Sequence, residues 1–165
     1  MTPAAKSRLY LAIIALLGLA VATMGYKFII AGSTLPAADG RIVVALEPGE
    51  RALLLREMRG FVEGLQRIAD ALARGDMQTV AQASRAMGTA AAHDVPLEML
   101  ARLPLEFKKL AFGVHGGFDA ISAEADRGGT PSQALRQLSG ILGNCVACHA
   151  TYQVAAGNPG PVTAR

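Results

Sequence analysis

The residues of this chain that could do chemistry gather near its end, in the run Cys145-Val146-Ala147-Cys148-His149. The two cysteines are the only ones in 165 residues, and C-x-x-C followed at once by histidine is the attachment sequence of a c-type haem. On a helix, thiols at i and i+3 and an imidazole at i+4 project from one face. One helical turn can therefore hold a porphyrin edge by two thioether bonds while the imidazole reaches the iron. The sequence predicts one covalent haem c.

Two other kinds of site use the same residue types. A redox dithiol of thioredoxin type follows a strand in a βαβ unit, and we expect no strand ahead of Cys145. A zinc site needs four nitrogen or sulfur ligands, and only His93 and His115 remain to complete one. Covalent haem is the favoured interpretation, and a redox dithiol or a structural disulfide is the alternative.

Helical segments must position this motif. The first is expected over 50–74, ending at Gly75-Asp76, and the second over about 76–92. Pro104 opens the third, and Thr130-Pro131 gives the fourth an N-cap and a proline at its first position. The apolar positions alternate at spacings of three and four in each segment: Leu54, Met58, Phe61, Leu65, Ile68 and Leu72; Met77, Val80, Ser84, Met87 and Ala91; Phe107, Leu110, Val114, Phe118 and Ile121; Leu135, Leu138, Leu142, Cys145, His149 and Tyr152.

These segments predict an all-α fold, an antiparallel four-helix bundle over 50–155 with the haem set into its core. Glycines at 113, 116 and 117 interrupt the third helix, where each costs about 1 kcal/mol relative to alanine. They indicate either a face against a bulky neighbour such as the porphyrin plane, or a kinked or frayed helix. Residues 156–165 are expected to form a flexible C-terminal tail.

Residues 1–31 are expected to form an N-terminal transmembrane helix. The charge-free run from Leu9 to Tyr26, extended past Lys27, is long enough to cross a bilayer. Lys6 and Arg8 precede it, so the positive-inside rule places the haem domain outside the cytoplasm. A cleaved signal peptide ending in the Ala20-Val21-Ala22 motif is the alternative, and it exports the same domain.

Residues 32–49 have the composition of a linker, with Gly32 and Pro36 near one end and Pro48 and Gly49 at the other. Within it, Arg41 to Leu46 is a short β-branched run. An isolated strand would have nothing to pair with. We therefore expect an extended stretch lying on the bundle.

Composition and charge exclude other classes. Hydrophobic residues make up 52% but aromatic ones only 5%, which favours helices. From residue 41 onward, 13 basic side chains almost balance 12 acidic ones. The sequence therefore lacks the excess of basic residues that is typical of nucleic-acid-binding proteins. No paired-carboxylate or nucleophile motif stands out, so we do not expect an enzyme.

A C-x-x-C-H motif in the last helix of a four-helix bundle resembles the class II cytochromes c, which comprise the cytochromes c′ and their low-spin, methionine-ligated relatives. The resemblance covers Glu50 to about Gln153, whereas the N-terminal helix and the 41–46 run depart from the usual soluble member. It implies Cys145 and Cys148 as the thioether residues and His149 as the proximal iron ligand. It also implies dimers through the first two bundle helices.

The resemblance places the other side of the iron against the early turns of the first bundle helix. Low-spin members have a methionine there, and cytochromes c′ leave the iron five-coordinate behind an apolar side chain. Met58 stands on that seam. Methionine on a seam is usually core filling, but the family position favours Met58 as the second ligand to the iron. Without it, Leu54 or Phe61 would screen the iron.

Several charged residues could serve the same site. His115 lies one residue off its seam, so we expect a partly exposed histidine or a propionate contact. His93 is expected in solvent. Arg56 and Arg59 flank Met58 and offer either a propionate partner or a solvated face. Lys108 and Lys109, also basic, could dock an acidic redox partner.

The functional expectation is a membrane-tethered monohaem c-type cytochrome on the periplasmic side of the bacterial inner membrane. It would carry electrons to and from redox partners of a respiratory or photosynthetic chain, with His149 and Met58 on the iron. The alternatives are a soluble periplasmic form, a five-coordinate protein binding small gases such as nitric oxide, or a haem subunit of a larger membrane complex.

Overall fold

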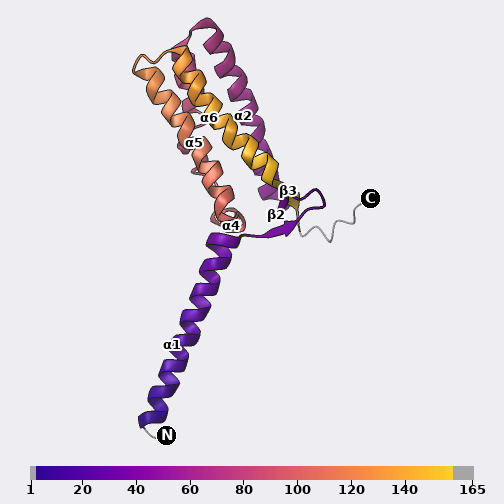
Figure 1. The fold of residues 1–165 in the computed structure, drawn as a ribbon, viewed down its shortest axis with the longest axis vertical. Coiled ribbons are helices and arrows are strands. Elements are labelled where there is room, and N and C mark those ends of the chain that lie inside the picture. The colour runs from indigo at the N-terminus through magenta and orange to yellow at the C-terminus, as the bar shows by residue number, and fades with distance from the viewer. Residues whose placement is uncertain (1–2, 158–165) are drawn as a thin grey trace.

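The computed structural model describes residues 3–157, with side chains from residue 7. It is mostly helical. A long helix, α1 (Pro3–Gly25), continues through a π-helical turn, η1 (Tyr26–Ala31), into a body of helices and three short strands. Figure 1 shows α1 extending away from that body. Most of the expected tail, from residue 158 onward, lies outside the described residues.

The N-terminal helical segment from Ser7 to Ala31 has a mean hydropathy of 2.1. Its large apolar side chains are exposed all round, as expected of a helix that is not packed against its own protein. By length and composition it can cross a membrane, and a signal sequence has the same properties.

Four longer helices make up most of the body: α2 (Pro48–Arg74), α3 (Met77–Arg85), α5 (Leu105–Asp126) and α6 (Pro131–Thr151). The starts of α2 and α6 are fixed by capping boxes, each followed by proline, in which Glu47 pairs with Glu50 and Thr130 with Gln133. Gly75 ends α2 in the left-handed conformation with φ 69°. The expected helix over 50–74 and the expected cap at Thr130 are confirmed.

The second helix is shorter than predicted. α3 ends at Arg85, and the chain then passes through a 3-10 turn, η2 (Thr89–Ala92), and the short helix α4 (Leu97–Arg102). Met87 is buried after the helix has ended, whereas Ala91 is exposed. Gly88 makes the early end feasible because a Cβ there would meet the carboxylate of Asp119 on α5.

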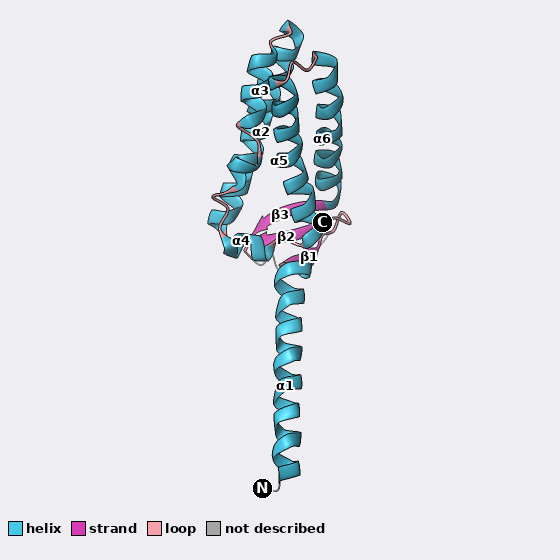
Figure 2. Cartoon of the chain, turned by 90° about the vertical axis from the view of Figure 1, so that its left-hand side faces the viewer, coloured by secondary structure: helices cyan, strands magenta, loops and turns pink. Residues whose placement is uncertain are grey.

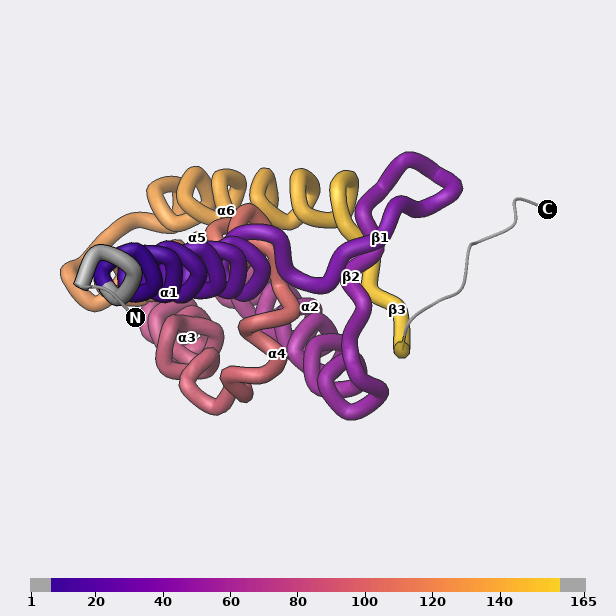
Figure 3. The backbone as a smooth tube through the Cα atoms, turned by 90° about the horizontal axis from the view of Figure 1, so that it is seen from below, coloured from indigo at the N-terminus to yellow at the C-terminus, as the bar shows by residue number. Residues whose placement is uncertain are grey.

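The prediction of an unpaired stretch over 41–46 is wrong. β2 (Ile42–Leu46) is the central strand of a sheet with the order β1-β2-β3. It pairs antiparallel with β1 (Thr34–Pro36) and parallel with β3 (Tyr152–Ala156). The expected linker over 32–49 therefore contains two strands. Tyr152, expected on the last helical seam, instead begins β3, which follows α6 without a loop (Figure 3).

The core has two parts. In the first, α2, α3, α5 and α6 enclose side chains such as Ile68, Val80 and Phe118. In the second, β2 contributes Val44 and Leu46, which pack with residues of α2, α4 and α5. Figure 2 shows the strands between the end of α1 and the ends of the helices. The sheet therefore closes the end of the body that faces α1.

The inward stripe of α6 differs from the predicted one at two positions. Leu135 and Leu142, expected in the core, are 58% and 40% exposed. The buried stripe instead runs through Ala134, Leu138 and Ile141 toward the half-buried Cys145. The two stripes share Leu138 and Cys145, and Ala134 and Ile141 face inward in place of Leu135 and Leu142, on the side of α6 that α5 approaches closely.

The connection between α1 and the body is a hydrogen-bonded joint and not a loose linker. Gly32 has φ 63°, and a Cβ there would lie 2.4 Å from the carbonyl oxygen of Arg102. The amide of Ser33 donates to the same oxygen at 2.7 Å, and Lys27 Nζ donates to the Gly32 carbonyl at 2.8 Å. Lys108 Nζ reaches from α5 to the carbonyl of Phe28 at 3.2 Å. These bonds tie the end of η1 to α4 and α5.

Candidate functional site

A cavity of about 320 Å³ opens between α2, α5, α6 and β3. Its volume is at the lower end of the range of about 300–1,000 Å³ that organic ligands occupy in proteins. Most of the lining is apolar, with a few charged side chains. It is formed by Arg41, Arg51, Leu54, Leu55, Glu57, Met58, Phe61, Phe107, Leu110, Ala111, Val114, His115, Asn144, Cys145, Cys148, His149, Tyr152, Gln153 and Val154.

All four residues predicted to bind the haem line this one cavity. Cys145, Cys148 and His149 come from the last turns of α6, and Met58 comes from the third turn of α2. Phe107 and Tyr152, whose rings meet edge to face at 5.3 Å, add to the apolar wall. Two helices that are far apart in sequence thus bring two thiols, an imidazole and a thioether to one space.

Both cysteines are free thiols and half-buried. Burial raises the pKa of each, and the neighbouring Cys145 raises that of Cys148 further. Reactive dithiols have lowered pKa values and sit at helix N-termini, where the dipole favours the thiolate. Here the pair lies at the C-terminal end of α6. The surroundings therefore disfavour the alternative of a redox dithiol.

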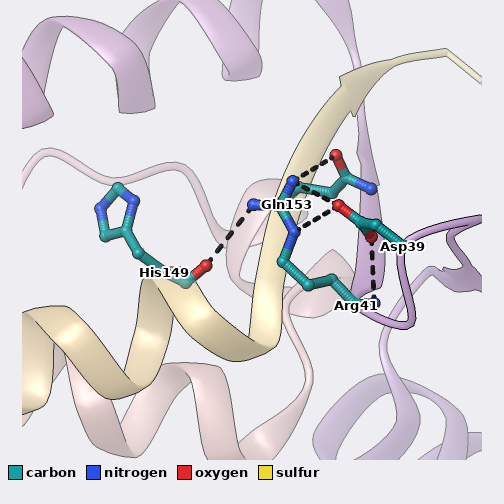
Figure 4. Close-up of polar contacts among 4 residues, drawn as sticks. All are labelled: Asp39, Arg41, His149 and Gln153. Atoms are coloured by element: carbon teal, nitrogen blue, oxygen red, sulfur yellow. Dashed lines mark hydrogen bonds and ion pairs between the residues drawn. The ribbon is translucent and has the colours of Figure 1, made fainter.

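The side chain of His149 is exposed and lines the cavity, and its backbone carbonyl accepts a hydrogen bond from Arg41. Arg41 Nη1 donates to the His149 carbonyl oxygen at 3.5 Å. Figure 4 shows the guanidinium beside this carbonyl and the imidazole ring projecting away from it. The ring is thus left free to engage a group in the cavity, and the bond to its backbone carbonyl restrains the turn that carries it.

Arg41 is a site residue that the sequence analysis missed. Besides His149, it contacts Asp39 Oδ2 at 2.7 Å and Gln153 Oε1 at 3.3 Å (Figure 4). The hydrogen bond from Arg41 holds the pKa of Asp39 below its usual value. In the sequence, Arg41 is recognisable only as an arginine beside the β-branched run. Its contacts with His149 and Gln153 become predictable only once β2 is known to pair with β3.

Met58 is half-buried, next to the buried Leu54 one turn earlier and the half-buried Phe61 one turn later. All three line the cavity. Of the arginines proposed to serve it, Arg56 and Arg59 are exposed, and neither lines this space. Arg51, one turn nearer the start of α2, does so together with Arg41 from the loop before β2.

The prediction that His115 is a partly exposed histidine is wrong. Its side chain is 4% exposed, and its Nδ1 lies 2.9 Å from the carbonyl of Met87. Its Nε2 lies 3.2 Å from Glu57 Oε1, and Phe61 covers the ring with centroids 5.3 Å apart. The bond to Glu57 raises the pKa of His115. α5 is buried against α3 as well as α6, so a residue one position off the seam still faces the interior.

Lys108, expected to dock a partner protein, is engaged within its own chain. Its ammonium group donates to the carbonyl oxygens of Phe28 and Ile29 at the end of η1, and burial lowers its pKa. Lys109 is exposed and pairs with Glu106 on its own helix at 2.7 Å. Nothing in the sequence indicated that the end of η1 lies beside α5, where its carbonyl groups accept hydrogen bonds from Lys108. His93 is exposed, as expected.

The glycines of α5 serve helix packing: the kinked or frayed helix is wrong, whereas Gly117 does lie against a bulky neighbour, the Ile141 side chain of α6. The helix runs unbroken from Leu105 to Asp126. A Cβ on Gly117 would lie 2.7 Å from Ile141 of α6, and one on Gly113 would lie 3.6 Å from Asn144. A Cβ on Gly116 would meet nothing within 4 Å. The glycine face therefore lets α6 approach α5.

No family model, curated protein or solved structure matches this chain. What the site can bind therefore follows from the residues that line the cavity. Among residues 7–157, no three His, Cys, Asp or Glu side chains gather where they could hold a bare metal ion. A haem iron needs fewer protein ligands than a bare metal ion, because the porphyrin supplies four of its ligands and the protein only one or two.

The donor set of the cavity fits a c-type haem. It offers two free thiols at the C-x-x-C spacing, an imidazole with no hydrogen bond to its ring in the described part of the chain, and a thioether. The apolar walls suit a macrocycle, and the guanidinium of Arg51 suits its carboxylates. Cys145, Cys148, His149 and Met58 are therefore the residues that would hold the group.

Proposed function

We propose that this chain is a membrane-anchored monohaem c-type cytochrome that carries electrons. The observation that supports it most directly is the convergence of Cys145, Cys148, His149 and Met58 on one apolar cavity. The first three are a short motif and would meet on any helix, but Met58 lies 87 positions earlier. Only the fold brings a thioether to the space beside the motif.

Each part of the cavity has a role in this proposal. Cys145 and Cys148 would hold the haem covalently through their sulfur atoms, and the imidazole of His149 and the thioether of Met58 would be the protein's ligands to its iron. When bound, the haem supplies a one-electron iron couple, whose potential a methionine ligand raises. Phe107, Leu54 and the other apolar walls keep water from the centre, Arg51 provides a partner for a propionate, and Arg41 restrains the turn that carries His149.

The proposal makes the helical body a four-helix bundle of α2, α3, α5 and α6 that holds one haem c. The packing of these helices around a shared core supports it. The three-stranded sheet at the end nearest α1 is an addition to that plan. We propose an electron carrier and no catalytic activity of its own, with redox proteins of a bacterial respiratory or photosynthetic chain as partners.

The proposed location is the bacterial inner membrane, with the haem domain in the periplasm. The length and hydropathy of the Ser7–Ala31 segment and the two basic residues before its apolar run support it. N-terminal sequencing of the mature protein tests this, since a start at Thr23 means cleavage.

The test of the function is the visible absorption spectrum of the full chain, purified from cells that attach haem c. We expect a low-spin ferric spectrum with the far-red methionine-to-iron band and no change in the ferrous spectrum on adding carbon monoxide. Met58→Ala should lose the band and gain carbon monoxide binding. Met77→Ala serves as the control, because this half-buried methionine of α3 does not line the cavity.

Two results would overturn the proposal. A mass spectrum of the full chain without the added mass of one haem would exclude the c-type cytochrome. A high-spin wild-type spectrum that responds to carbon monoxide at once would make Met58 core packing, with Leu54 and Phe61 as the screen of the iron. The gas-binding function would then replace electron transfer.

A further inference from the structure

His115 of α5 lies in a wall between two cavities. The first is the cavity of the proposed haem. The second, of about 360 Å³, is lined by α2, by the end of α3 and the chain that follows it, and by His115. Three side chains line both cavities: Glu57 and Phe61 of α2, and His115 itself. These three therefore form the wall, and only His115 is buried.

The two cavities leave the turn of α2 that carries Met58 with little support from α5 and α6. The backbone of α2 packs closely along α3 but approaches those of α5 and α6 at few points. Gly60 and Gly64 follow Met58 in the same helix, and glycine in a helix interior weakens the helix because it leaves the backbone more conformational freedom. Side-chain contacts must therefore hold this turn at a fixed place beside the first cavity.

His115 contacts α2 on both sides of Met58. Its Nε2 donates to Oε1 of Glu57, the residue before Met58, at 3.2 Å. Its ring packs against that of Phe61, three residues after Met58, with centroids 5.3 Å apart. Its Nδ1 donates to the Met87 carbonyl oxygen at 2.9 Å, which fixes the orientation of the ring. Among the described residues, the bond to Glu57 is the only hydrogen bond or ion pair that joins α2 to α5 or α6.

We propose that His115 is a positioning residue for Met58. Through Glu57 and Phe61 it holds the turn of α2 at the distance from α6 at which the thioether reaches the iron of the haem. It acts through these two side chains and is not itself an iron ligand. The inference rests on the proposed function, since it takes Met58 as the second ligand. It makes retention of that ligand depend on one hydrogen bond from α5, without which the iron is open to small molecules more of the time.

Two substitutions of His115 separate its two hydrogen bonds. The amide nitrogen of glutamine takes about the place of Nε2, and that of asparagine takes about the place of Nδ1. His115→Gln therefore still donates to Glu57, whereas His115→Asn keeps a donor only toward the Met87 carbonyl. Both variants lose the aromatic ring and leave an amide in the same interior site. A difference between them therefore reports the bond to α2 and not the general cost of replacing a buried histidine.

The test is a titration of the ferric full chain with imidazole, followed by loss of the far-red methionine-to-iron band. Apparent affinity for imidazole rises with the fraction of chains in which Met58 has left the iron. A hydrogen bond to a charged group is strong enough to shift that fraction about tenfold. We therefore expect His115→Asn to bind imidazole about tenfold more tightly than the wild type, and His115→Gln to stay close to it. The controls are the exposed His93→Asn and the buried Val80→Ala of α3, which line neither cavity and should leave the affinity unchanged.

Amide hydrogen exchange over residues 54–62 reports the same turn without use of the haem spectrum. We expect exchange there to be about tenfold faster in His115→Asn than in His115→Gln, and equal in the two variants over α3. Equal imidazole affinity or equal exchange over 54–62 in the two variants overturns the inference, as does an asparagine variant that binds imidazole no more tightly than Val80→Ala. In these cases the wild type keeps its far-red band and the proposed function stands. A wild type without that band fails the proposed function, and the inference fails with it.

Discussion

Replacing His115 with leucine should destabilise the protein more than any exposed histidine substitution could. His115 is 4% exposed and bonded through both ring nitrogens, to the Met87 carbonyl at 2.9 Å and to Glu57 at 3.2 Å. Leucine fills a similar volume but bonds to neither. The change therefore leaves a carboxylate and a carbonyl without their partner in the interior.

The size of the effect follows from the burial of the two partners. Breaking a fully buried ion pair costs about 3–5 kcal/mol. The Glu57 side chain keeps 25% of its surface exposed, so water can partly replace its partner, and we expect a loss of about 2–3 kcal/mol. For a chain of this size, that loss lowers the midpoint of thermal unfolding by about 5–10 °C.

The loss should depend on pH in a definite direction. The bond to Glu57 raises the pKa of His115 above its ordinary value of 6.5. A raised pKa contributes stability that is fully present below pH 6.5 and is lost as the pH rises through the folded-state pKa. The difference between wild type and His115→Leu should therefore be largest at mildly acidic pH and shrink under alkaline conditions. Glu57→Gln should remove most of this pH dependence.

The assay is denaturant unfolding of the full chain in detergent, followed by helical circular dichroism from pH 5 to pH 9. His93→Leu is the matched control, because His93 is exposed and its replacement should change stability by less than about 0.5 kcal/mol. The reasoning about the buried pair is refuted if His115→Leu costs no more than His93→Leu, or if its cost grows with rising pH.

Three other predictions test the packing. Gly117→Ala places a Cβ 2.7 Å from a side chain of α6 and should cost about 1–3 kcal/mol in thermal unfolding, whereas Gly116→Ala, in open space on the same helix, should stabilise by about 0.5–1 kcal/mol. Gly32→Ala should loosen the joint, because it strains a φ of 63° and meets the backbone after α4; faster proteolytic release of the body from the anchor would show it. Asp119→Ala removes hydrogen bonds from Thr89 that lower the pKa of the carboxyl. A lowered pKa contributes stability above the ordinary value of 3.8 and loses it as the pH falls, so this variant should unfold more easily at pH 7 and show a smaller further loss in acid titration.

Much of the helical framework could be predicted from local signals. The caps at Glu47 and Thr130, the left-handed Gly75 and the seams of α2 and α5 each depend on residues within a few positions of one another. The attachment motif is local for the same reason. These features follow from helix geometry alone, so a single sequence contains what is needed to find them.

The predictions that were wrong concern features whose contact partners are distant in sequence. β2 looked unpaired because its parallel partner begins at Tyr152, and Arg41 acquired its contacts only through that pairing. On α6, two seams that share Leu138 and Cys145 compete, and Leu135 and Leu142 favoured the wrong one. The choice was decided by how closely Gly117 lets Ile141 approach, a distance that no pattern within α6 encodes.

The parallel pairing of β2 with β3 also sets an order on folding. β2 is synthesised more than a hundred residues before β3, and Tyr152 follows His149 by three positions. Closing so long a loop is slow, and contacts of such high sequence separation form late. The sheet therefore stays incomplete until residues 152–156 have been synthesised. The turn that carries the two cysteines is thus among the last parts of the molecule to become rigid, and its thiols stay accessible until then.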